Sequence, residues 1–521
     1  MSISTKMSLT LFLVSFNIYV VSSAKILAVY PTPSISHQIV YQILTLELVK
    51  RGHEVTVITT DPVYPKGRGP PNLIEIDVRD LSYKMWADGW MSDKSKSEAD
   101  HLSQVNNIVR LMSKIIAAQL VSNKEIQEII NNKKSKYDLL IIEAYVKPVL
   151  IYSHIFKVPV IQINSAGGLS HNFKAVGAPT HPFLYPAIPT QRIYNLSNYE
   201  KLQELYYKWR MENAFDEIEE EDNRSLQKLF GTDVPSIREL YNNVDLLFLN
   251  IHRIWTDNQP YPPNVIHIGG IHTHPPTKGL PKDLDLLMNN AKNGVIYFSL
   301  GTNVNTTNLP FDKIQVITKV FSQLPYDIIW KCNQDSIPGK TENVKLYKWV
   351  PQADLLKHPK IKLFITQAGL QSTDEAIEAG VPVIGIPIFG DQWYNAEKYQ
   401  QLKIGIKLDL KDLTEEMFKG AIETVISDDS YRSNMKRMRK IIKDEPQTPL
   451  ERAVWWVEYV LRHKGAKHLR AAGANISWTQ YLELELVAIV VLFLLSILLI
   501  FFVTIYYVMK SLRAYSKVKT S

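Results

Sequence analysis

The sequence predicts an α/β protein with two doubly wound domains and a C-terminal transmembrane helix. Short apolar runs alternate with helical patterns from residue 25 onward, which is typical of parallel sheets whose strands are joined by helices. Proline and glycine cluster between residues 260 and 281, after which the alternation resumes. A later run of 23 residues, 486–508, contains no charged side chain. The 521 residues are enough for several cores of ordinary size.

Residues 1–23 predict a secretory signal peptide. Lys6 precedes the apolar run 9–21, and the small residues 22–24 offer a cleavage site. The alternative is a buried N-terminal strand or an anchor that is not cleaved.

Two successive α/β units follow, a first domain at 24–270 and a second at 285–465, joined by a linker at 271–284. The expected strands of the first unit are 26–30, 55–59, 139–142, 158–163 and 246–249, with helices at 38–50 and 149–156. The expected strands of the second are 295–299, 327–331, 363–366, 383–386 and 404–407, with a helix at 374–379. Two facing units of this kind leave a cleft at the carboxyl ends of their strands, where ligands usually bind.

The C-terminal part predicts a single-pass membrane protein of type I. A juxtamembrane segment, 466–485, precedes the 486–508 helix, which as a helix spans roughly 34 Å of bilayer. Residues 471–485 contain no Lys or Arg, whereas the tail 509–521 contains four bases. The excess of positive charge therefore places the tail in the cytosol and both domains in the lumen.

The last five residues place Lys517 and Lys519 five and three positions from the end. This arrangement resembles the dilysine retrieval signal of endoplasmic-reticulum membrane proteins, so we expect that membrane. A solvated basic tail is the alternative. Four Asn-x-Ser/Thr triplets lie on the side that this topology makes lumenal and are candidate glycosylation sites: Asn195, Asn223, Asn305 and Asn475.

Charge and cysteine content narrow the function classes. The net charge is +7, but residues 24–508 hold 54 bases and 52 acids, so the body is nearly neutral and a nucleic-acid partner is not expected. Cys332 is the single cysteine. It excludes a disulfide within the chain and any cysteine-based metal site.

One continuous segment, residues 349–392, carries the most informative pattern. It contains Trp349-Val-Pro-Gln352, then Phe364-Ile-Thr-Gln-Ala-Gly-Leu-Gln-Ser-Thr-Asp-Glu375, then Gly380-Val-Pro382 and Asp391-Gln392. This segment resembles the donor-binding signature of the UDP-glycosyltransferase family, which includes animal UDP-glucuronosyltransferases and insect and plant glucosyltransferases. The likeness extends from the signal peptide to the lysine-bearing tail. It implies the GT-B fold and, because of the anchor, a membrane-bound member of the insect type.

The resemblance assigns the second domain to the UDP-sugar. The indole of Trp349 offers a flat face for uracil, the amide of Gln352 can bond the nucleoside, and Glu375 can accept from two ribose hydroxyls. The remaining donor-binding candidates serve the diphosphate and the hexose. They are Thr302, Gln367, Gly369 and Ser372, at turns after strands where backbone N–H groups and a helix N-terminus can hold phosphate, and the sugar-binding pair Asp391 and Gln392.

The first domain is expected to bind the acceptor and supply the base. His37 follows the first strand, where the family places its catalytic histidine, and an imidazole can take a hydroxyl proton near neutral pH. Glu143 ends the strand at 139–142 where many members have Asp, and its carboxylate can orient the ring.

Two departures from the family pattern bear on the sugar. Gln367 stands where many members have His, and Asn250 stands where vertebrate members have Arg. Both remove charge from the donor site. Glucuronate would favour a nearby base, yet residues 387–397 contain none and two acids. The sequence therefore favours UDP-glucose and leaves UDP-glucuronate open.

Competing motifs lack the expected context. Asp283 and Asp285 resemble a metal-binding DxD but follow Pro281-Lys282 in the linker. His267, His272 and His274 lie in a Gly/Pro-rich loop without a matching ligand pair. We therefore expect no metal and no cofactor, with the UDP-sugar as co-substrate.

The predicted activity is inverting, metal-independent hexosyl transfer from a UDP-sugar to a small lipophilic acceptor. The alternatives are a member that binds UDP-sugar or lipophiles without turnover, and an epimerase or phosphorylase on the same fold. The oligomeric state stays open, with a homo-oligomer among the partners considered.

Overall fold

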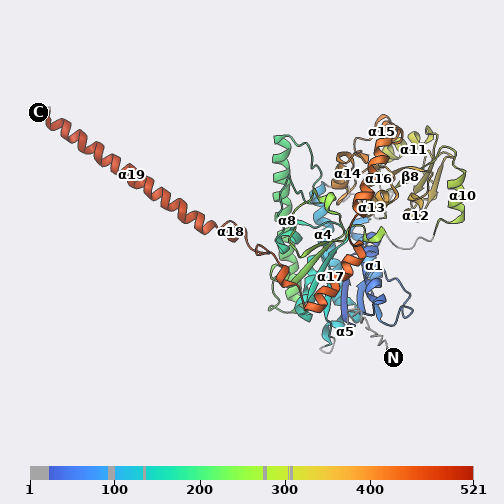
Figure 1. Cartoon of the computed structure of the whole chain (residues 1–521), viewed down its shortest axis with the longest axis horizontal. Coiled ribbons are helices and arrows are strands. Elements are labelled where there is room, and N and C mark those ends of the chain that lie inside the picture. Colours follow the sequence, from blue (N-terminus) through green and yellow to red (C-terminus); the bar gives the residue numbers. More distant parts are fainter. Residues whose placement is uncertain are drawn as a thin grey trace, which may run out of the picture.

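The computed structural model describes residues 23–91, 100–132, 136–273, 279–302, 304 and 309–519. The predicted signal peptide, except for Ser23, lies outside the described residues, as does the sequon residue Asn305. Figure 1 shows a two-part α/β body from which one long helix, α19, projects far to one side.

The first domain is built on a seven-stranded parallel sheet in the order β3-β2-β1-β4-β5-β6-β7. Its strands are β1 Lys25–Tyr30, β2 Glu54–Thr59, β3 Leu73–Asp77, β4 Leu139–Glu143, β5 Val160–Asn164, β6 Val244–Leu249 and β7 Val265–His267. The central strands are apolar and buried on both faces, as expected for a parallel sheet covered by helices. The strand order reverses between β1 and β4, which creates the switch point where α/β proteins bind ligands.

Helices cover both faces of this sheet. They are α1 Ile35–Lys50, α2 Arg79–Trp86, α4 His101–Ser122, α5 Lys124–Asn131, α6 Ile151–Phe156, α7 Ser170–Val176, α8 Asn198–Phe230 and α9 Ile237–Leu240. The longest of them, α8, begins at a capping box in which Ser197 and Glu200 satisfy each other's backbone N–H groups.

The second domain has a six-stranded parallel sheet in the order β10-β9-β8-β11-β12-β13. Its strands are β8 Val295–Ser299, β9 Asp327–Lys331, β10 Val344–Tyr347, β11 Ile361–Thr366, β12 Val383–Gly385 and β13 Gly405–Lys407. Its helices are α10 Lys282–Asn290, α11 Phe311–Ser322, α12 Gln352–Leu356, α13 Leu370–Ala379, α14 Gln392–Gln401, α15 Glu415–Ser427 and α16 Asp429–Lys443. The switch point here lies between β8 and β11.

The Gly/Pro cluster at 260–281 contains regular structure and is followed directly by a helix. Strand β7 lies within residues 260–281 and completes the first sheet, and α10 begins at Lys282, inside the predicted linker 271–284. Pro281 presets the backbone for entry into α10, while Asp283 and Asp285 occupy its first turn and complement the helix dipole. These two acids therefore have a structural role. Strands β3 and β10 and helix α8 were also not predicted.

Helix α17, Pro449–His463, returns to the first domain although the sequence places residues up to 465 in the second. Val454, Val457 and Val460 are buried with the side chains of α1 and the first sheet. Arg51 Nη1 donates to Glu458 Oε1 at 3.1 Å. The apolar face of α17 thus completes the core of the first domain, which sequence order does not reveal.

The C-terminal helices are α18 Trp478–Tyr481 and α19 Leu484–Lys519. Residues 484–516 form a helix that is long and apolar enough to cross a membrane, and none of its most apolar stretch is buried in the described structure. The helix extends beyond the predicted span 486–508 into the basic tail.

Candidate active site

His37 and Glu143 meet at the switch point of the first sheet. His37 lies in the first turn of α1, directly after β1, and Glu143 is the last residue of the neighbouring strand β4. His37 Nδ1 is 3.4 Å from Glu143 Oε1. The Glu143 side chain is fully buried, whereas 24% of the His37 side chain is exposed. One edge of the histidine ring is therefore accessible, whereas the carboxylate is shielded from solvent.

Two further groups fix the Glu143 carboxylate. The Tyr41 hydroxyl donates to Oε1 at 3.0 Å, and the Thr32 backbone N–H donates to Oε2 at 3.2 Å. Burial, followed by the negative charge of Glu143, raises the pKa of Tyr41 well above its ordinary value, so the phenol stays a donor. Sequence reasoning missed Tyr41. The spacing of His37 and Tyr41, one turn apart on α1, could have revealed it.

A pocket of about 920 Å³ opens beside His37. Most of its wall is apolar, supplied by α2, α4, α8 and the loops after β4 and β5. The apolar lining residues are Trp86, Val105, Ile108, Val109, Met112, Tyr145, Leu169, Ile188, Pro189, Phe215 and Phe389. Polar groups are Thr32, Ser34, His37, Asn164 and Asp391. The pocket thus combines one edge of hydrogen-bonding groups with a broad hydrophobic wall.

The second domain brings Gln352, Ser372 and Glu375 into one hydrogen-bonded group. Gln352 Nε2 donates to Ser372 Oγ at 2.9 Å and to Glu375 Oε2 at 2.7 Å. The Tyr297 hydroxyl donates to Gln352 Oε1 at 3.1 Å. Burial raises the pKa of Glu375. Trp349, which follows β10, is 60% exposed and unlike a core tryptophan, so its indole is available for stacking.

The two predicted phosphate-binding turns are adjacent. Thr302 follows β8 and Gln367 follows β11, and these strands pair with each other at the second switch point. Gly301 has φ +78°, and a side chain there would collide with the Gln367 amide. Gly369 is the N-cap of α13, whose first N–H groups and dipole face the same edge. Backbone and amide donors of this kind are the groups that can hold an anion.

Lys331 is a cation near this edge that the sequence reasoning did not select. It ends β9, opposite Ser299 of β8, and its Nζ donates to the Gly301 carbonyl oxygen at 2.8 Å. Burial lowers its pKa. The sequence signal that could have identified Lys331 is a lysine at the C-terminal end of an apolar strand.

Asp391 and Gln392 begin α14 and hold the loop that faces the first domain. Asp391 Oδ2 accepts from the Leu370 N–H at 3.2 Å and from Asn395 Nδ2 at 2.7 Å. Gln392 Oε1 accepts from the N–H groups of Ile388 and Phe389 at 2.8 and 2.9 Å. Gln392 can therefore offer a ligand its NH₂ group. Burial raises the pKa of Asp391, and this carboxyl lines the same pocket as His37.

The other motifs have structural partners. Asn250, at the position of the vertebrate arginine, is buried and donates through Nδ2 to the Ser165 carbonyl oxygen at 2.9 Å. His267 faces the Ile251 carbonyl and His272 the Gln371 carbonyl, while His274 lies outside the described residues. Across the described ranges, no three His, Cys, Asp or Glu side chains gather as metal ligands.

The two facing α/β domains have the fold of solved glycosyltransferases. A glycosyltransferase of kitacinnamycin superposes with a TM-score of 0.59 at 18% identity over 84% of this chain and 98% of its own. An Arabidopsis thaliana glycosyltransferase complexed with UDP-L-rhamnose gives 0.56 at 12% identity over 85% of this chain and 100% of its own. At these identities the likeness establishes the GT-B fold.

Sequence comparison then specifies the family. Residues 24–519 match the model described as "UDP-glucoronosyl and UDP-glucosyl transferase", and the chain belongs to this family of UDP-glycosyltransferases. An ecdysteroid UDP-glucosyltransferase of Lymantria dispar multicapsid nuclear polyhedrosis virus is 35% identical over 89% of this chain and 93% of its own length. UDP-glucosyltransferase 2 of Dactylopius coccus is 34% identical over 94% of this chain and 93% of its own.

Proposed function

We propose that the protein transfers glucose from UDP-glucose, with inversion and without a metal, to a hydroxyl of a small lipophilic acceptor. The observation that carries this proposal is the His37–Glu143 pair at the edge of an apolar pocket that Asp391 of the donor-binding domain also lines. Base, acceptor space and sugar-facing loop thus share one cavity.

His37 is the general base in this proposal. Its Nδ1–H points to the Glu143 carboxylate, which leaves Nε2 to take the acceptor proton as the hydroxyl oxygen attacks the anomeric carbon. The bond from that carbon to the UDP oxygen breaks, and UDP leaves with the electron pair. Glu143 stabilises the resulting imidazolium while Tyr41 and Thr32 keep the carboxylate in place.

The second domain stabilises the leaving group. The turns at Thr302 and Gln367, together with the N-terminus of α13, direct hydrogen-bond donors toward the position of the diphosphate. Trp349 and Glu375 hold uracil and ribose. In this mechanism these hydrogen-bond donors, and not a metal ion, stabilise the charge of the leaving diphosphate.

The charges around the sugar loop favour glucose over glucuronate. Residues 387–397 contain no Lys or Arg. The next residue, Lys398, is fully buried with its Nζ 2.5 Å from Asp257 Oδ2, and it donates to the Tyr194 hydroxyl. Its charge is already compensated, so it cannot serve a glucuronate carboxylate without leaving Asp257 unpaired. The similar viral and insect proteins named as glucosyltransferases support the same choice.

The acceptor is proposed to be a rigid lipophile with one reactive hydroxyl, such as a steroid or a phenol. The wall of aromatic and branched side chains matches such a body, and the polar edge at Ser34, His37 and Asn164 matches a hydroxyl. Several similar viral proteins are named as ecdysteroid glucosyltransferases, which is consistent with a steroid-sized acceptor.

The test is acceptor-dependent UDP release from membranes that contain the full chain, with UDP-glucose and UDP-glucuronate each paired with steroids and phenols. We expect turnover with UDP-glucose. Turnover with UDP-glucuronate alone would overturn the sugar assignment. UDP binding without turnover for any pair would favour the alternative, a non-catalytic binding protein, against which the retained His37–Glu143 pair argues.

We further propose a type I topology in the endoplasmic-reticulum membrane, with both domains lumenal and the Lys517/Lys519 tail as retrieval signal. Asn195 is then the preferred glycan site, because it lies exposed in the loop before α8. Asn475 Nδ2 donates to Arg238 O and Asn242 Oδ1, and Asn223 Oδ1 accepts from the Ile237 N–H, so both are engaged.

Endoglycosidase H should shift the mobility of the wild type more than that of Asn195→Gln. An unglycosylated wild type would contradict the lumenal placement. Deletion of residues 517–521 should release the protein to later compartments, and unchanged retention would exclude the tail as the signal.

A further inference from the structure

Helix α8 presents an exposed apolar face to one side and lines a pocket on the other. One face points outward and consists of Tyr199, Leu202, Leu205, Tyr206 and Trp209, each at least 43% exposed. These five side chains, here called the α8 outer face, follow helical spacing and form a single stripe. The rings of Tyr206 and Trp209 stack with centroids 5.9 Å apart. Contiguous exposed apolar side chains of this size mark an interaction surface.

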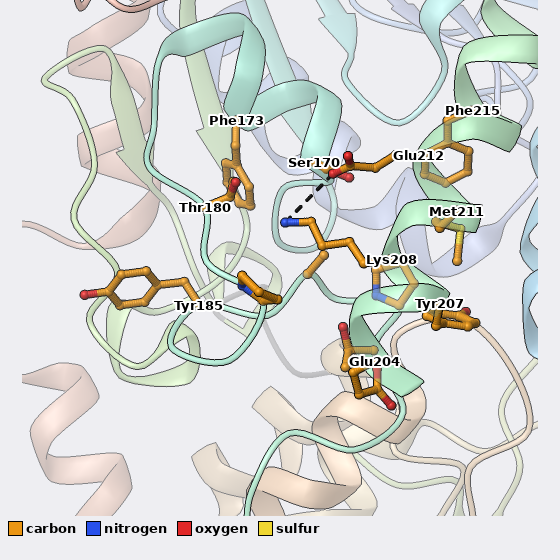
Figure 2. Close-up of a pocket in the computed structure, with 14 residues that line it drawn as sticks. Ser170, Phe173, Thr180, Tyr185, Glu204, Tyr207, Lys208, Met211, Glu212 and Phe215 are labelled. Carbon is orange, nitrogen blue, oxygen red and sulfur yellow. Dashed lines mark ion pairs between the residues drawn. The ribbon is translucent and has the colours of Figure 1, made fainter. Parts of the chain in front are cut away.

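The opposite face of α8 lines a pocket of about 620 Å³. Figure 2 shows Tyr207, Met211 and Phe215 on α8, with Phe173 and Tyr185 across from them. This pocket shares Pro189 and Phe215 with the larger pocket that contains His37. The two pockets therefore adjoin at these two side chains, and the wall of the smaller one also carries the charged residues Glu204, Lys208 and Glu212.

The membrane helix leaves the body on the α8 side. Figure 1 shows α8 along the edge from which α18 and α19 depart. The segment before α18 is tied to α7, which lines the same pocket, because the Asn475 N–H donates to the Lys174 carbonyl oxygen at 2.9 Å. Trp478 and Tyr481 are each 60% exposed at the base of α19, as aromatic residues at a membrane interface are.

The two halves of α8 also differ in charge. Residues 198–211 carry three bases and two acids, whereas residues 212–230 carry seven acids and two bases. The apolar first half can approach a lipid surface, while the acidic second half favours water and avoids anionic headgroups.

We propose that the α8 outer face lies against the bilayer in which α19 is anchored, and that the pocket beneath it admits lipophilic acceptors from the lipid to His37. The passage rests on the proposed transferase function, whereas the contact with lipid does not. Insertion of amphipathic helices into the interface is typically about 5–10 Å deep.

Lipid contact is measured on the full chain in phosphatidylcholine vesicles. The only native thiol is removed by Cys332→Ser, and a fluorophore is attached at Leu202→Cys or, as a control, at Glu220→Cys. Glu220 is exposed on the same helical face five turns later, about 27 Å along the axis. Doxyl-labelled lipid should remove most of the fluorescence at position 202 and little at 220. Equal quenching at both positions, or none at 202, would overturn the proposal.

The passage is measured by steady-state kinetics. Tyr206→Glu with Trp209→Glu should raise KM about tenfold for an acceptor dissolved in the lipid, because two charges oppose insertion, and should leave KM for UDP-glucose unchanged. Glu220→Gln is the matched control. An unchanged acceptor KM in a variant that still binds UDP would exclude the passage. Quenching at position 202 in a protein without any turnover would keep the lipid contact and reject the transferase function.

Discussion

The two halves of the active site are built in opposite ways. The proposed donor half comes mostly from one continuous segment, residues 349–392, and offers a nucleotide amides, backbone N–H groups and an exposed indole. The acceptor half is assembled from α1, α2, α4, β4 and α8, and it surrounds a buried carboxylate with apolar side chains. Binding of a charged nucleotide requires many fixed polar partners. A lipophilic acceptor requires a pocket that excludes water and one base to take its proton. The division predicts that rate and donor affinity depend on different domains.

The largest effect is expected for His37. His37→Ala should lower kcat by about 10²–10⁴-fold, because general base catalysis contributes that much, and should leave the Kd for UDP nearly unchanged. Stopped-flow turnover and calorimetric UDP binding measure the two quantities. His37→Gln, which keeps a hydrogen-bonding side chain without a usable base, should be equally slow. Wild-type turnover in either variant would remove His37 as the base.

Trp349 should show the reverse pattern. Trp349→Ala loses a stacking contact that typically contributes about 1–3 kcal/mol, so the Kd for UDP should rise about ten- to hundredfold. At saturating UDP-glucose the kcat should be retained. Trp349→Phe, which keeps a flat ring, should lie between the two. An unchanged Kd in Trp349→Ala would separate the indole from the uracil site.

Tyr41 should have a smaller effect that depends on His37. Tyr41→Phe removes a hydrogen bond to the Glu143 carboxylate, typically worth about 1.5–3 kcal/mol, and should lower kcat about tenfold. It should also shift the pH–rate profile, since Glu143 then stabilises the imidazolium differently. In the His37→Ala background the substitution should change nothing more. If kcat fell by a further tenfold in that background, the effect of Tyr41 would be structural and independent of the base.

The smallest effect is expected for Asp222 and concerns the stability of the fold rather than the reaction. Burial raises the pKa of Asp222 on α8 to about 7, against a hydrogen bond from Ser113 Oγ. An unfolded carboxyl ionises near pH 4, so between about pH 4 and 7 the folded state holds more protons and stability falls as pH rises. Asp222→Asn should therefore unfold at a higher temperature than the wild type at pH 8, with a smaller difference at pH 5. The same difference at both pH values would contradict this assignment.

The same contrast explains what the sequence could predict. Several donor residues are recognisable because β11 leads into α13 within a few residues, and this single strand-turn-helix unit presents Gln367, Gly369, Ser372 and Glu375. Most strands of both sheets and the candidate membrane helix follow from local apolar patterns. The roles of Tyr41 and Lys331 and the packing of α17 depend on which elements lie side by side, and no sequence motif reports this. Helix α8 has apolar residues on two faces, so its periodicity did not reveal it either. His37 and Glu143 were predicted because one follows and the other ends a strand at positions where the family resemblance implies a histidine and an acid.

The division between the domains is tested most directly by measuring UDP affinity and single-turnover rate in parallel for the wild type, His37→Ala and Trp349→Ala. The proposed mechanism predicts that His37→Ala loses rate and keeps UDP affinity, while Trp349→Ala loses affinity and keeps the rate at saturating donor. Parallel loss of both quantities in both variants would contradict it.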